Sequence, residues 1–396
     1  MEMNKKRLAD TIKLGPWSNV AAARSFFYHL AASESVEYGM DWSAYAADFD
    51  NVSQLGAWLI AEGVGPLAYN RFQRAWPELA SHLQIDAFAA AAENSIHFER
   101  LQRVSQTFEK SGVQFALLKG AALAHYVYPD PSMRTMSDID IWLPHENMET
   151  AFHLMEGIGF KAYGSEKRPP KLQLLSQGEI QFYDSQNGLV ELHWAPMSGW
   201  FLRTAANIDN DAIWSRTQTL VNSAGRVLAA EDTIIQVALH TAVNHRFRLA
   251  AIRSMVDLTL TAKTQSVEWS IVAERAKKWR VATAVWCVLN LAQSLIGLPE
   301  ASAAMETLEP SLVRRALLRR FVSSDAILSG DNKLGEAMEN NLTGYLFLLL
   351  LVDRPIDAVK LFGRVIWPSR EWLDARYKAP TNRWQHFLRL LRRGKI

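Results

Sequence analysis

The spacing of apolar positions changes twice along the chain and divides it into three segments. In residues 1–110 and again in residues 201–396, apolar side chains recur three or four positions apart, as on the buried face of a helix. Residues 111–200 instead contain short apolar runs and alternating polar and apolar positions that end at glycine or proline. We therefore expect an N-terminal helical region, an α/β core and a C-terminal helical region, together an α+β fold.

The central segment predicts strands that form a small mixed sheet. A buried strand is expected at residues 113–118, followed by a helix at 120–126, and a second strand at 138–143 begins with polar–apolar alternation. Strands at 180–183 and 189–194 are joined by a turn rich in Asp, Asn and Gly, which favours an antiparallel hairpin. Further helices are expected at 145–158, 231–245, 249–263, 267–278 and 282–296, with a break at 330–333.

Charge and composition narrow the classes of function. A formal net charge of +2 provides no large positive field for a long nucleic acid, so nucleic acid is not expected as a partner. Cys287 is the sole cysteine, which excludes an internal disulfide, and its apolar neighbours predict a buried thiol. No apolar signal core follows Lys5 and Lys6, and the longest apolar run, 346–352, is shorter than the roughly 20 residues of a membrane span. A cytoplasmic protein is expected.

Two aspartates at the start of the second predicted strand carry the first sign of chemistry. Asp138 and Asp140 are two positions apart, so their carboxylates point to one face and lie within about 7 Å of each other. Two like charges are unfavourable unless one takes a proton or a cation compensates, and Mg²⁺ prefers oxygen ligands and phosphates. Solvated aspartates explain most chance pairs of this kind. Here Ile139 and Ile141 make the opposite face apolar, which favours a metal site.

Glu191 supplies a third carboxylate on another predicted strand, between the apolar residues Val190 and Leu192. Three acids carried by strands could bind two metal ions about 3.5–4 Å apart. Glu191 could then be a metal ligand, a general base, or both. The alternative, a partly exposed glutamate paired with a lysine, is favoured for Glu191 alone but not for Glu191 together with the two aspartates.

A basic residue and a glycine end the first predicted strand. Gly120 would let a phosphate approach the N–H groups at the start of a helix, and Lys119 would add a positive charge. Arg134 precedes the acidic pair and could bind phosphate oxygens or pair with Asp138. The alternative for Lys119 and Arg134 is a solvated surface cation.

These motifs resemble the uncharacterised nucleotidyltransferase family of bacteria, within the DNA polymerase beta-like nucleotidyltransferase superfamily. The resemblance rests on residues 117–123, 128–129 and 134–141, and on 191–194, which is similar to the family's third-carboxylate strand. It implies a nucleotidyltransferase core, metal binding by Asp138, Asp140 and Glu191, and phosphate near Lys119 and Gly120. The superfamily's usual Gly-Ser or Gly-Gly opening is absent, because Ala121 follows Gly120.

The resemblance and the acidic trio together predict a function. We expect a Mg²⁺-dependent nucleotidyltransferase, with two Mg²⁺ ions and Mn²⁺ as an alternative. It would move a nucleoside monophosphate from an NTP, with ATP as the expected donor, to a hydroxyl or phosphate of a small molecule, peptide or protein and release pyrophosphate. One alternative is a nucleotide-binding regulatory or scaffold protein without turnover. Addition of nucleotides to RNA ends is disfavoured by the low net charge.

Several polar residues have no role assigned by the sequence. Arg253 and Asp257 are four positions apart on a predicted helix, which favours an ion pair between them. His240 and His245 do not share the face that a helical metal site uses, so packing or substrate contact is expected. His193 shares the strand face of Glu191 and could contact substrate or be structural. Trp142, Trp194 and Trp200 could stack on a base or pack in the core.

Overall fold

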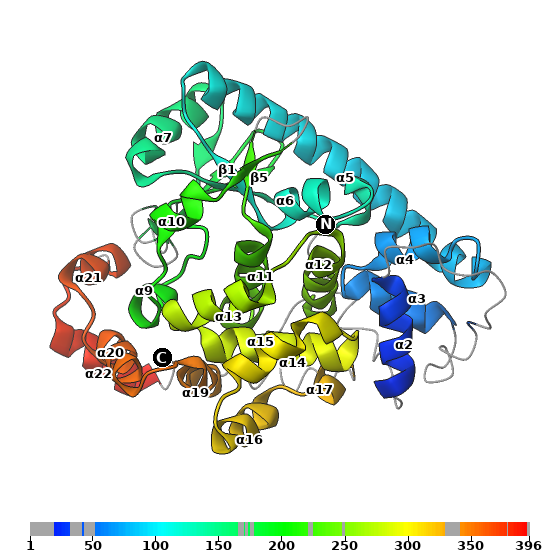
Figure 1. Cartoon of the computed structure of the whole chain (residues 1–396). Helices are drawn as coiled ribbons and strands as arrows, with labels where there is room; N and C mark the ends of the chain where they lie inside the picture. The colour runs from blue at the N-terminus through cyan, green and yellow to red at the C-terminus, as the bar shows by residue number, and fades with distance from the viewer. Residues whose placement is uncertain are drawn as a thin grey trace.

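The computed structural model describes residues 20–31, 42, 52–164, 170, 173–174, 178–220, 225–247, 250–328, 341–377 and 379–393. It is an α+β fold, as expected, in which helices flank a mixed sheet (Figure 1). No described helix combines the length and apolar character that a membrane span requires. The predicted break at 330–333 lies outside the described residues.

The sheet has seven strands in the order β3-β4-β5-β2-β1-β7-β6. The neighbours β2 and β5 are parallel, as are β1 and β7, and the other neighbouring pairs are antiparallel. The antiparallel pairing of β4 with β5 confirms the predicted hairpin. The sheet also extends past residue 200 through β6 and β7, which the sequence pattern did not indicate. The strands are β1 (Ala116–Leu118), β2 (Ile139–Trp142), β3 (Lys161–Ala162), β4 (Glu179–Tyr183), β5 (Leu189–His193), β6 (Gln218–Thr219) and β7 (Arg226–Val227).

The helices fall before, within and after this sheet. Those before it are α2 (Val20–Leu30), α3 (Val52–Ala61), α4 (Gly65–Phe72) and α5 (Pro77–Lys110). Those among the strands are α6 (Lys119–Tyr126), α7 (Met148–Gly157), α9 (Leu202–Ala205) and α10 (Asn210–Ser215). Those after it are α11 (Ala230–Leu239), α12 (Ala251–Thr264), α13 (Trp269–Lys278), α14 (Ala282–Leu295), α15 (Ser302–Leu308), α16 (Leu312–Phe321), α17 (Ser324–Leu328), α19 (Asn341–Leu351), α20 (Pro355–Ile366), α21 (Arg370–Arg376) and α22 (Arg383–Arg393).

The two faces of the sheet meet different surroundings. Ile139 and Ile141 of β2 point to a buried apolar cluster that includes Phe108 at the end of α5 and Met155 of α7. Because side chains alternate along a strand, Asp140 points to the opposite face. Figure 1 shows α5 running past α4 at one end and past α7 and the strands at the other. The alternation that the sequence displays therefore separates an apolar core from an acidic face.

The larger apolar core joins helices from both ends of the chain. Phe27 of α2 and Leu59 of α3 belong to the same buried cluster as Leu258 of α12 and Val285 of α14. Cys287 lies in this cluster, and burial raises the pKa of its thiol to about 12, in agreement with the expected buried cysteine. The N-terminal and C-terminal helical regions thus pack together on the acidic side of the sheet, and their behaviour as separate domains stays a prediction.

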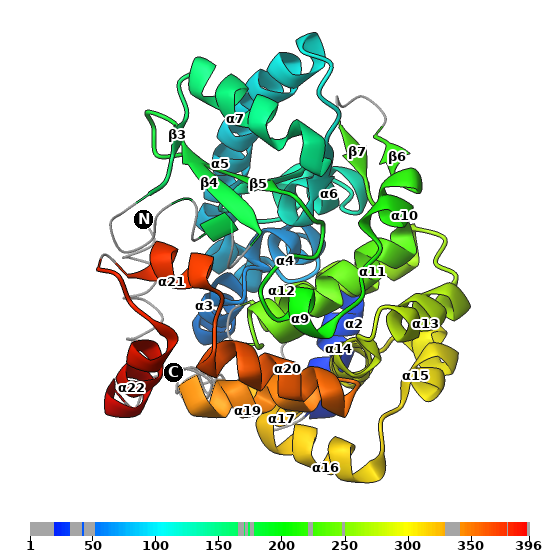
Figure 2. The same ribbon diagram turned by 90° about the vertical axis from the view of Figure 1, so that its left-hand side faces the viewer.

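Two details of the C-terminal region matter for the site. The helix expected at 231–245 is α only as far as Leu239 and continues as a π-helix over His240–Asn244. The last helices, α20 to α22, form a group beside the rest of the molecule, and α20 packs on α9 just after the last long strand (Figure 2).

Candidate active site

The parallel pairing of β2 with β5 brings together two acidic residues, Asp140 and Glu191, that are far apart in the sequence. Asp140 is the register partner of Glu191, and both side chains are buried on the same face of the sheet. Gln181 of β4 is the next partner across, and its amide donates to Glu191 Oε1 at 2.6 Å. That bond orients the carboxylate and leaves Oε2 toward Lys119, at 3.9 Å from its Nζ.

Lys119 is positioned by the end of β1. Leu118 pairs with Asp140 across the sheet, and the next residue turns away with φ +47°, a left-handed conformation that is uncommon for a residue with a side chain. This turn directs the ammonium group back over the sheet, where Nζ lies 2.6 Å from Asp140 Oδ1. The strained backbone conformation is held by the strand before it and the helix α6 that starts there.

His193 completes the cluster from the end of β5. Its Nε2 lies 2.8 Å from Asp140 Oδ1 and 3.6 Å from Glu191 Oε2, and its Nδ1 lies 3.5 Å from Glu179 Oε2. From the sequence, His193 could contact substrate or be structural, and its spacing from Glu191 placed both residues on one face. What the sequence could not provide was the alignment of β5 with β2, which sets the imidazole against Asp140.

The charges in this cluster shift one another strongly. Burial alone would raise the pKa of Asp140, but Lys119 and then His193 hold it well below its usual range. Burial and Lys119 lower the pKa of His193, yet its bonds to Asp140 and Glu191 raise it to about 9. Burial lowers the pKa of Lys119, while Asp140 and Glu191 raise it above its usual value. Asp140 is therefore ionised between two cations.

Asp138 lies one residue before β2 and is less buried than Asp140. Its Oδ1 accepts a hydrogen bond from Ser137 Oγ at 3.2 Å. Burial and the nearby charges of Asp140 and Glu191 raise its pKa to about 7, against the opposing effect of Lys119. Burial is the largest cause of this rise and the two neighbouring carboxylates add to it, so a metal ion bound here would favour the ionised form of Asp138.

A metal ion fits the donor set of this face. Asp140, Glu191 and His193 each offer a ligand atom, and these atoms lie within 4.8 Å of one another. Two carboxylates suit Mg²⁺ and Mn²⁺, and an imidazole nitrogen suits Mn²⁺ or Zn²⁺ better than Mg²⁺. Lys119 Nζ now contacts the same oxygen of Asp140 as His193 does, so a cation at this oxygen would have to replace at least one of those contacts.

Gly120 and the backbone of Lys119 lie at the start of α6. A Cβ atom on Gly120 would meet Met136 Cγ at 3.1 Å, so the absence of a side chain allows close packing between α6 and the segment before Asp138. The Lys119 N–H donates to Gln236 Oε1 at 3.5 Å, and Gln236 Nε2 donates to the Pro196 carbonyl at 2.7 Å. Phosphate binding by Lys119 and Gly120 stays a prediction.

Arg134 is buried and held by Asp257 of α12. Its Nε and Nη2 donate to the two oxygens of that carboxylate at 2.9 and 2.8 Å, and the Tyr128 hydroxyl donates to Asp257 Oδ1 at 2.7 Å. The expected Arg253–Asp257 pair is wrong for the described residues, because Arg134 occupies both carboxylate oxygens. A phosphate contact by Arg134 stays a prediction, and it would compete with this bidentate pair.

Arg253 supports the same segment, and His240 and His245 contact each other. Arg253 Nη1 donates to Thr135 Oγ1 at 2.9 Å, and Thr135 in turn donates to the Gly63 carbonyl at 3.0 Å. In the π-helix residues five apart share a face, so His240 Nε2 and His245 Nε2 meet at 2.7 Å, a pairing that an α-helical face would not allow. Burial and Lys119 lower the pKa of His240 well below its usual value, so we expect it to be neutral.

The three tryptophans have different surroundings. Trp142 is buried in the larger core against Trp214, with ring centroids 5.0 Å apart, so the packing interpretation holds for it. Trp194 stacks on His145, and Trp200 stacks on Tyr345.

Comparison with known proteins identifies the family. The model of the uncharacterised nucleotidyltransferase family matches residues 50–297, more than half of the chain. A search of curated proteins gives no match. The matched residues include every strand of the sheet, α6 and the helix α12 that holds Arg134. The chain therefore belongs to the uncharacterised nucleotidyltransferase family and is a nucleotidyltransferase enzyme.

Proposed function

We propose that this enzyme moves a nucleoside monophosphate from a Mg²⁺-bound NTP, with ATP as the donor, to a hydroxyl or phosphate of a small molecule, peptide or protein. The observation that carries the proposal is the register pairing of Asp140 with Glu191, which sets two buried carboxylates side by side beneath Lys119. Two adjacent buried carboxylates cost desolvation and repulsion free energy, and such groups cluster at functional sites, where a cation and a phosphate group can use them.

Asp140, Glu191 and Asp138 would hold Mg²⁺; in a Mn²⁺ complex a neutral His193 would give up its bond to Asp140 and become a further ligand. When bound, the metal ion supplies positive charge to the triphosphate and lowers the pKa of an attacking hydroxyl. Lys119 would turn from Asp140 to a phosphate oxygen, and the first N–H groups of α6 favour negative charge at the same place. Pyrophosphate leaves from the side opposite the attacking oxygen.

Glu191 is the proposed general base. Gln181 holds Oε1, so Oε2 is the oxygen available to accept the proton of the acceptor hydroxyl as the new phosphorus–oxygen bond forms. His193 donates to Asp140 and fixes that carboxylate toward the site. Arg134, through Asp257, and Arg253, through Thr135, hold the segment that leads to Asp138, which makes them positioning residues in this proposal.

The test combines binding with transfer. ATP labelled at the α-phosphate is titrated with and without MgCl₂, and then incubated with the full-length protein and fractionated cell extract to detect labelled acceptors and released pyrophosphate. Asp140→Asn and Glu191→Gln should each reduce transfer by about 100-fold or more. Glu149→Gln, the same chemical change on the exposed side of α7, should leave it unchanged. Near-ultraviolet circular dichroism checks that the variants are folded.

The outcomes separate the candidate functions. Metal-independent ATP binding, or binding and transfer that are unchanged in Asp140→Asn, would refute the proposal. Mg²⁺-dependent binding without labelling of any fraction would favour a regulatory or scaffold protein that has lost turnover. Label in RNA would identify a nucleotide-adding enzyme instead.

A further inference from the structure

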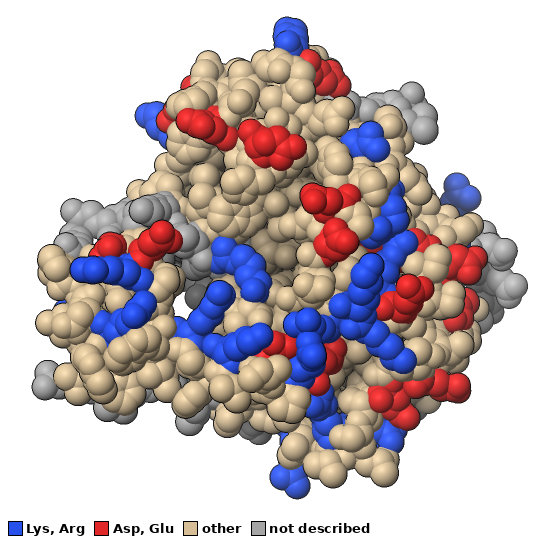
Figure 3. All heavy atoms as spheres, turned by 60° about the vertical axis from the view of Figure 1, so that its left-hand side comes forward, with Lys and Arg blue, Asp and Glu red and all other residues tan. Residues whose placement is uncertain are grey.

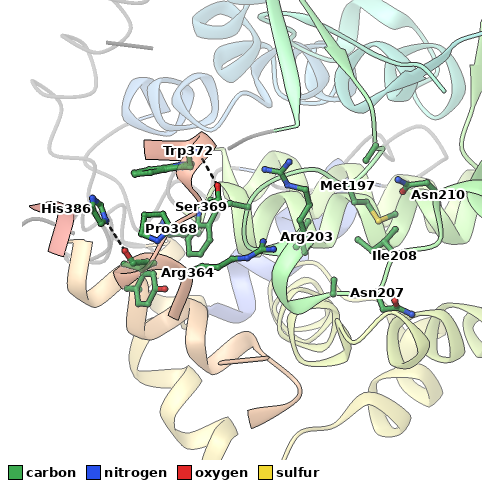
Figure 4. Close-up of a pocket in the computed structure, with 17 residues that line it drawn as sticks. Met197, Arg203, Asn207, Ile208, Asn210, Arg364, Pro368, Ser369, Trp372 and His386 are labelled. Atoms are coloured by element: carbon green, nitrogen blue, oxygen red, sulfur yellow. Dashed lines mark hydrogen bonds between the residues drawn. The ribbon is translucent and has the colours of Figure 1, made fainter. Parts of the chain in front are cut away.

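A cavity of about 930 Å³ lies beyond the carboxyl end of β5, between α9 and the group α20–α22 (Figure 4). Its lining begins with Ala195 and Met197, two and four positions after His193. Gln236 joins this loop to the site, because it contacts both the Pro196 carbonyl and the Lys119 N–H. The cavity therefore adjoins the candidate active site but is built from other side chains.

The walls of the cavity are positively charged. Arg203 of α9 and Arg364 of α20 both line the cavity (Figure 4), and Arg364 Nη1 donates to Thr204 Oγ1 of α9 at 2.8 Å. Burial and the neighbouring Arg364 lower the pKa of Arg203, so the two charges repel. None of the described residues that line the cavity is acidic, and no described carboxylate lies within ion-pair distance of Arg364. On this face Lys and Arg side chains gather around a hollow (Figure 3).

Aromatic side chains form the other part of the lining. Trp200 stacks on Tyr345 with ring centroids 5.9 Å apart and an interplanar angle of 9°, and Trp372 of α21 also lines the cavity (Figure 4). Met197 and Ile208 add apolar surface. The volume is within the range of about 300–1,000 Å³ typical of small-molecule sites. A small ligand with an apolar ring and a negative charge matches both parts of this lining.

We propose that this cavity binds the acceptor, and that the acceptor is a small molecule with an anionic phosphate or carboxylate next to an aromatic or apolar body. This inference rests on the proposed function. The triphosphate of the NTP would be neutralised by the metal ion and Lys119, whereas Arg203 and Arg364 belong to a separate set of cations. No described carboxylate pairs with Arg364 and none of the described lining residues is acidic, so an anion in this cavity would gain a charge-assisted contact, and the acceptor is the other substrate.

The experiment uses 1-naphthyl phosphate as the anionic probe and 1-naphthol as its neutral counterpart, with the full-length protein in a calorimeter. The phosphate should bind at least about tenfold more tightly than the naphthol, because one charge-assisted contact is worth about 1.5–3 kcal/mol. Arg364→Gln should weaken the binding of 1-naphthyl phosphate by about tenfold or more and leave the binding of 1-naphthol unchanged. Trp372→Ala should weaken both. Arg319→Gln on the exposed side of α16 is the matched control and should change neither.

Further arms separate this inference from the proposed function. Asp140→Asn should abolish Mg²⁺-dependent ATP binding and leave the affinity for 1-naphthyl phosphate unchanged. Equal binding of the two naphthyl probes, no binding of either, or no effect of Arg364→Gln would overturn the inference and leave nucleotidyl transfer standing. Displacement of the probe by Mg²⁺–ATP would assign the cavity to the nucleotide and also overturn it. Probe binding without any ATP binding would refute nucleotidyl transfer and, with it, the acceptor assignment.

Discussion

Near the candidate site, two buried aspartates each bind two other side chains. Lys119 and His193 share Asp140, and Arg134 shares Asp257 with Tyr128. The first group lies where a metal ion and phosphates are proposed to bind, so its contacts can be exchanged for contacts to substrate. The second group is buried between α12 and the segment before Asp138, and we expect it to be structural, because a phosphate contact by Arg134 would have to break its bidentate pair with Asp257.

Asp257→Asn tests that structural role. The substitution leaves the Arg134 guanidinium buried without a compensating charge, so we expect the free energy of unfolding to fall by about 3–5 kcal/mol. The measurement is urea unfolding followed by circular dichroism. The double variant Arg134→Met with Asp257→Leu removes both charges and should lose less stability than Asp257→Asn alone. The pairing would be contradicted if the double variant lost as much free energy of unfolding as Arg134→Met and Asp257→Leu lose separately when added together.

Glu62 predicts a pH dependence of stability. Burial raises its pKa from 4.5 to about 7, although the Ile252 N–H and Arg253 oppose the rise. Below pH 4.5 the carboxyl group is protonated in the folded and unfolded chains alike. Between pH 4.5 and 7 the unfolded chain loses its proton first, so the contribution of Glu62 to the free energy of unfolding falls as the pH rises.

Glu62→Gln should remove this contribution. Since a tenfold difference in proton affinity corresponds to about 1.4 kcal/mol, the variant should be more stable than the wild type by up to about 3 kcal/mol at pH 8, and not at pH 4. The measurement is urea unfolding at several pH values. Exposed Glu78→Gln is the control and should follow the wild type. Identical pH profiles for Glu62→Gln and the wild type would refute the prediction.

At the scale of elements, the alignment of strands decides which residues meet. A slip of one residue between β2 and β5 would send Glu191 to the apolar face of the sheet, away from Asp140. The hairpin of β4 and β5 is tied to α5 at its turn, where Arg100 Nε donates to Asp184 Oδ2 at 2.8 Å and the Gly188 N–H donates to Asp184 Oδ1 at 2.8 Å. This contact helps to hold β5 in place.

Gly188→Ala tests the tie between the hairpin and α5. A Cβ atom there would lie 1.8 Å from Arg100 Cζ, so the guanidinium must move away from Asp184. We expect a loss of about 1–3 kcal/mol in the free energy of unfolding. In the Arg100→Met variant, Gly188→Ala should lower the free energy of unfolding by clearly less, because the ion pair with Asp184 is already absent. Equal costs in both backgrounds, measured by urea unfolding, would show that the contact contributes nothing.

At the scale of the whole molecule, one apolar core joins helices from both ends of the chain. Residues before 84 and residues after 228 belong to the same buried cluster, and β7 extends the sheet beside β1. The α/β core is therefore covered on its acidic face by the helical regions. The cavity also depends on this arrangement, because Arg203 and Arg364 are brought together by the packing of α20 on α9.

A fragment of residues 111–200 should not fold alone. It lacks β7, the end of α5 and the helix α12 that pairs Asp257 with Arg134, so the apolar face would lose its contact with α5 and the acidic face would be uncovered. We expect a weak near-ultraviolet circular dichroism signal and poor dispersion of amide proton shifts, with the full-length chain as the reference. A fragment that unfolds cooperatively would show instead that the α/β core is an independent domain.

The sequence by itself determined the local features of this protein, because they depend on residues near one another in the chain. Alternation placed Asp138 and Asp140 opposite Ile139 and Ile141, the turn composition predicted the hairpin, and helical spacing located α11 to α14. The short motifs were sufficient to indicate the family, since they include the strands and the turn that carry the acidic residues.

Only the tertiary structure decided which distant residues act together. The partner of Arg134 lies 123 positions away, and His193 reaches Asp140 from 53 positions away. The pairing of His240 with His245 required a π-helix, which helical spacing does not reveal. Such contacts depend on strand alignment and helix packing, which arise from the burial of many side chains at once. The cavity beside the site is the clearest case, because no local pattern joins α9 to α20.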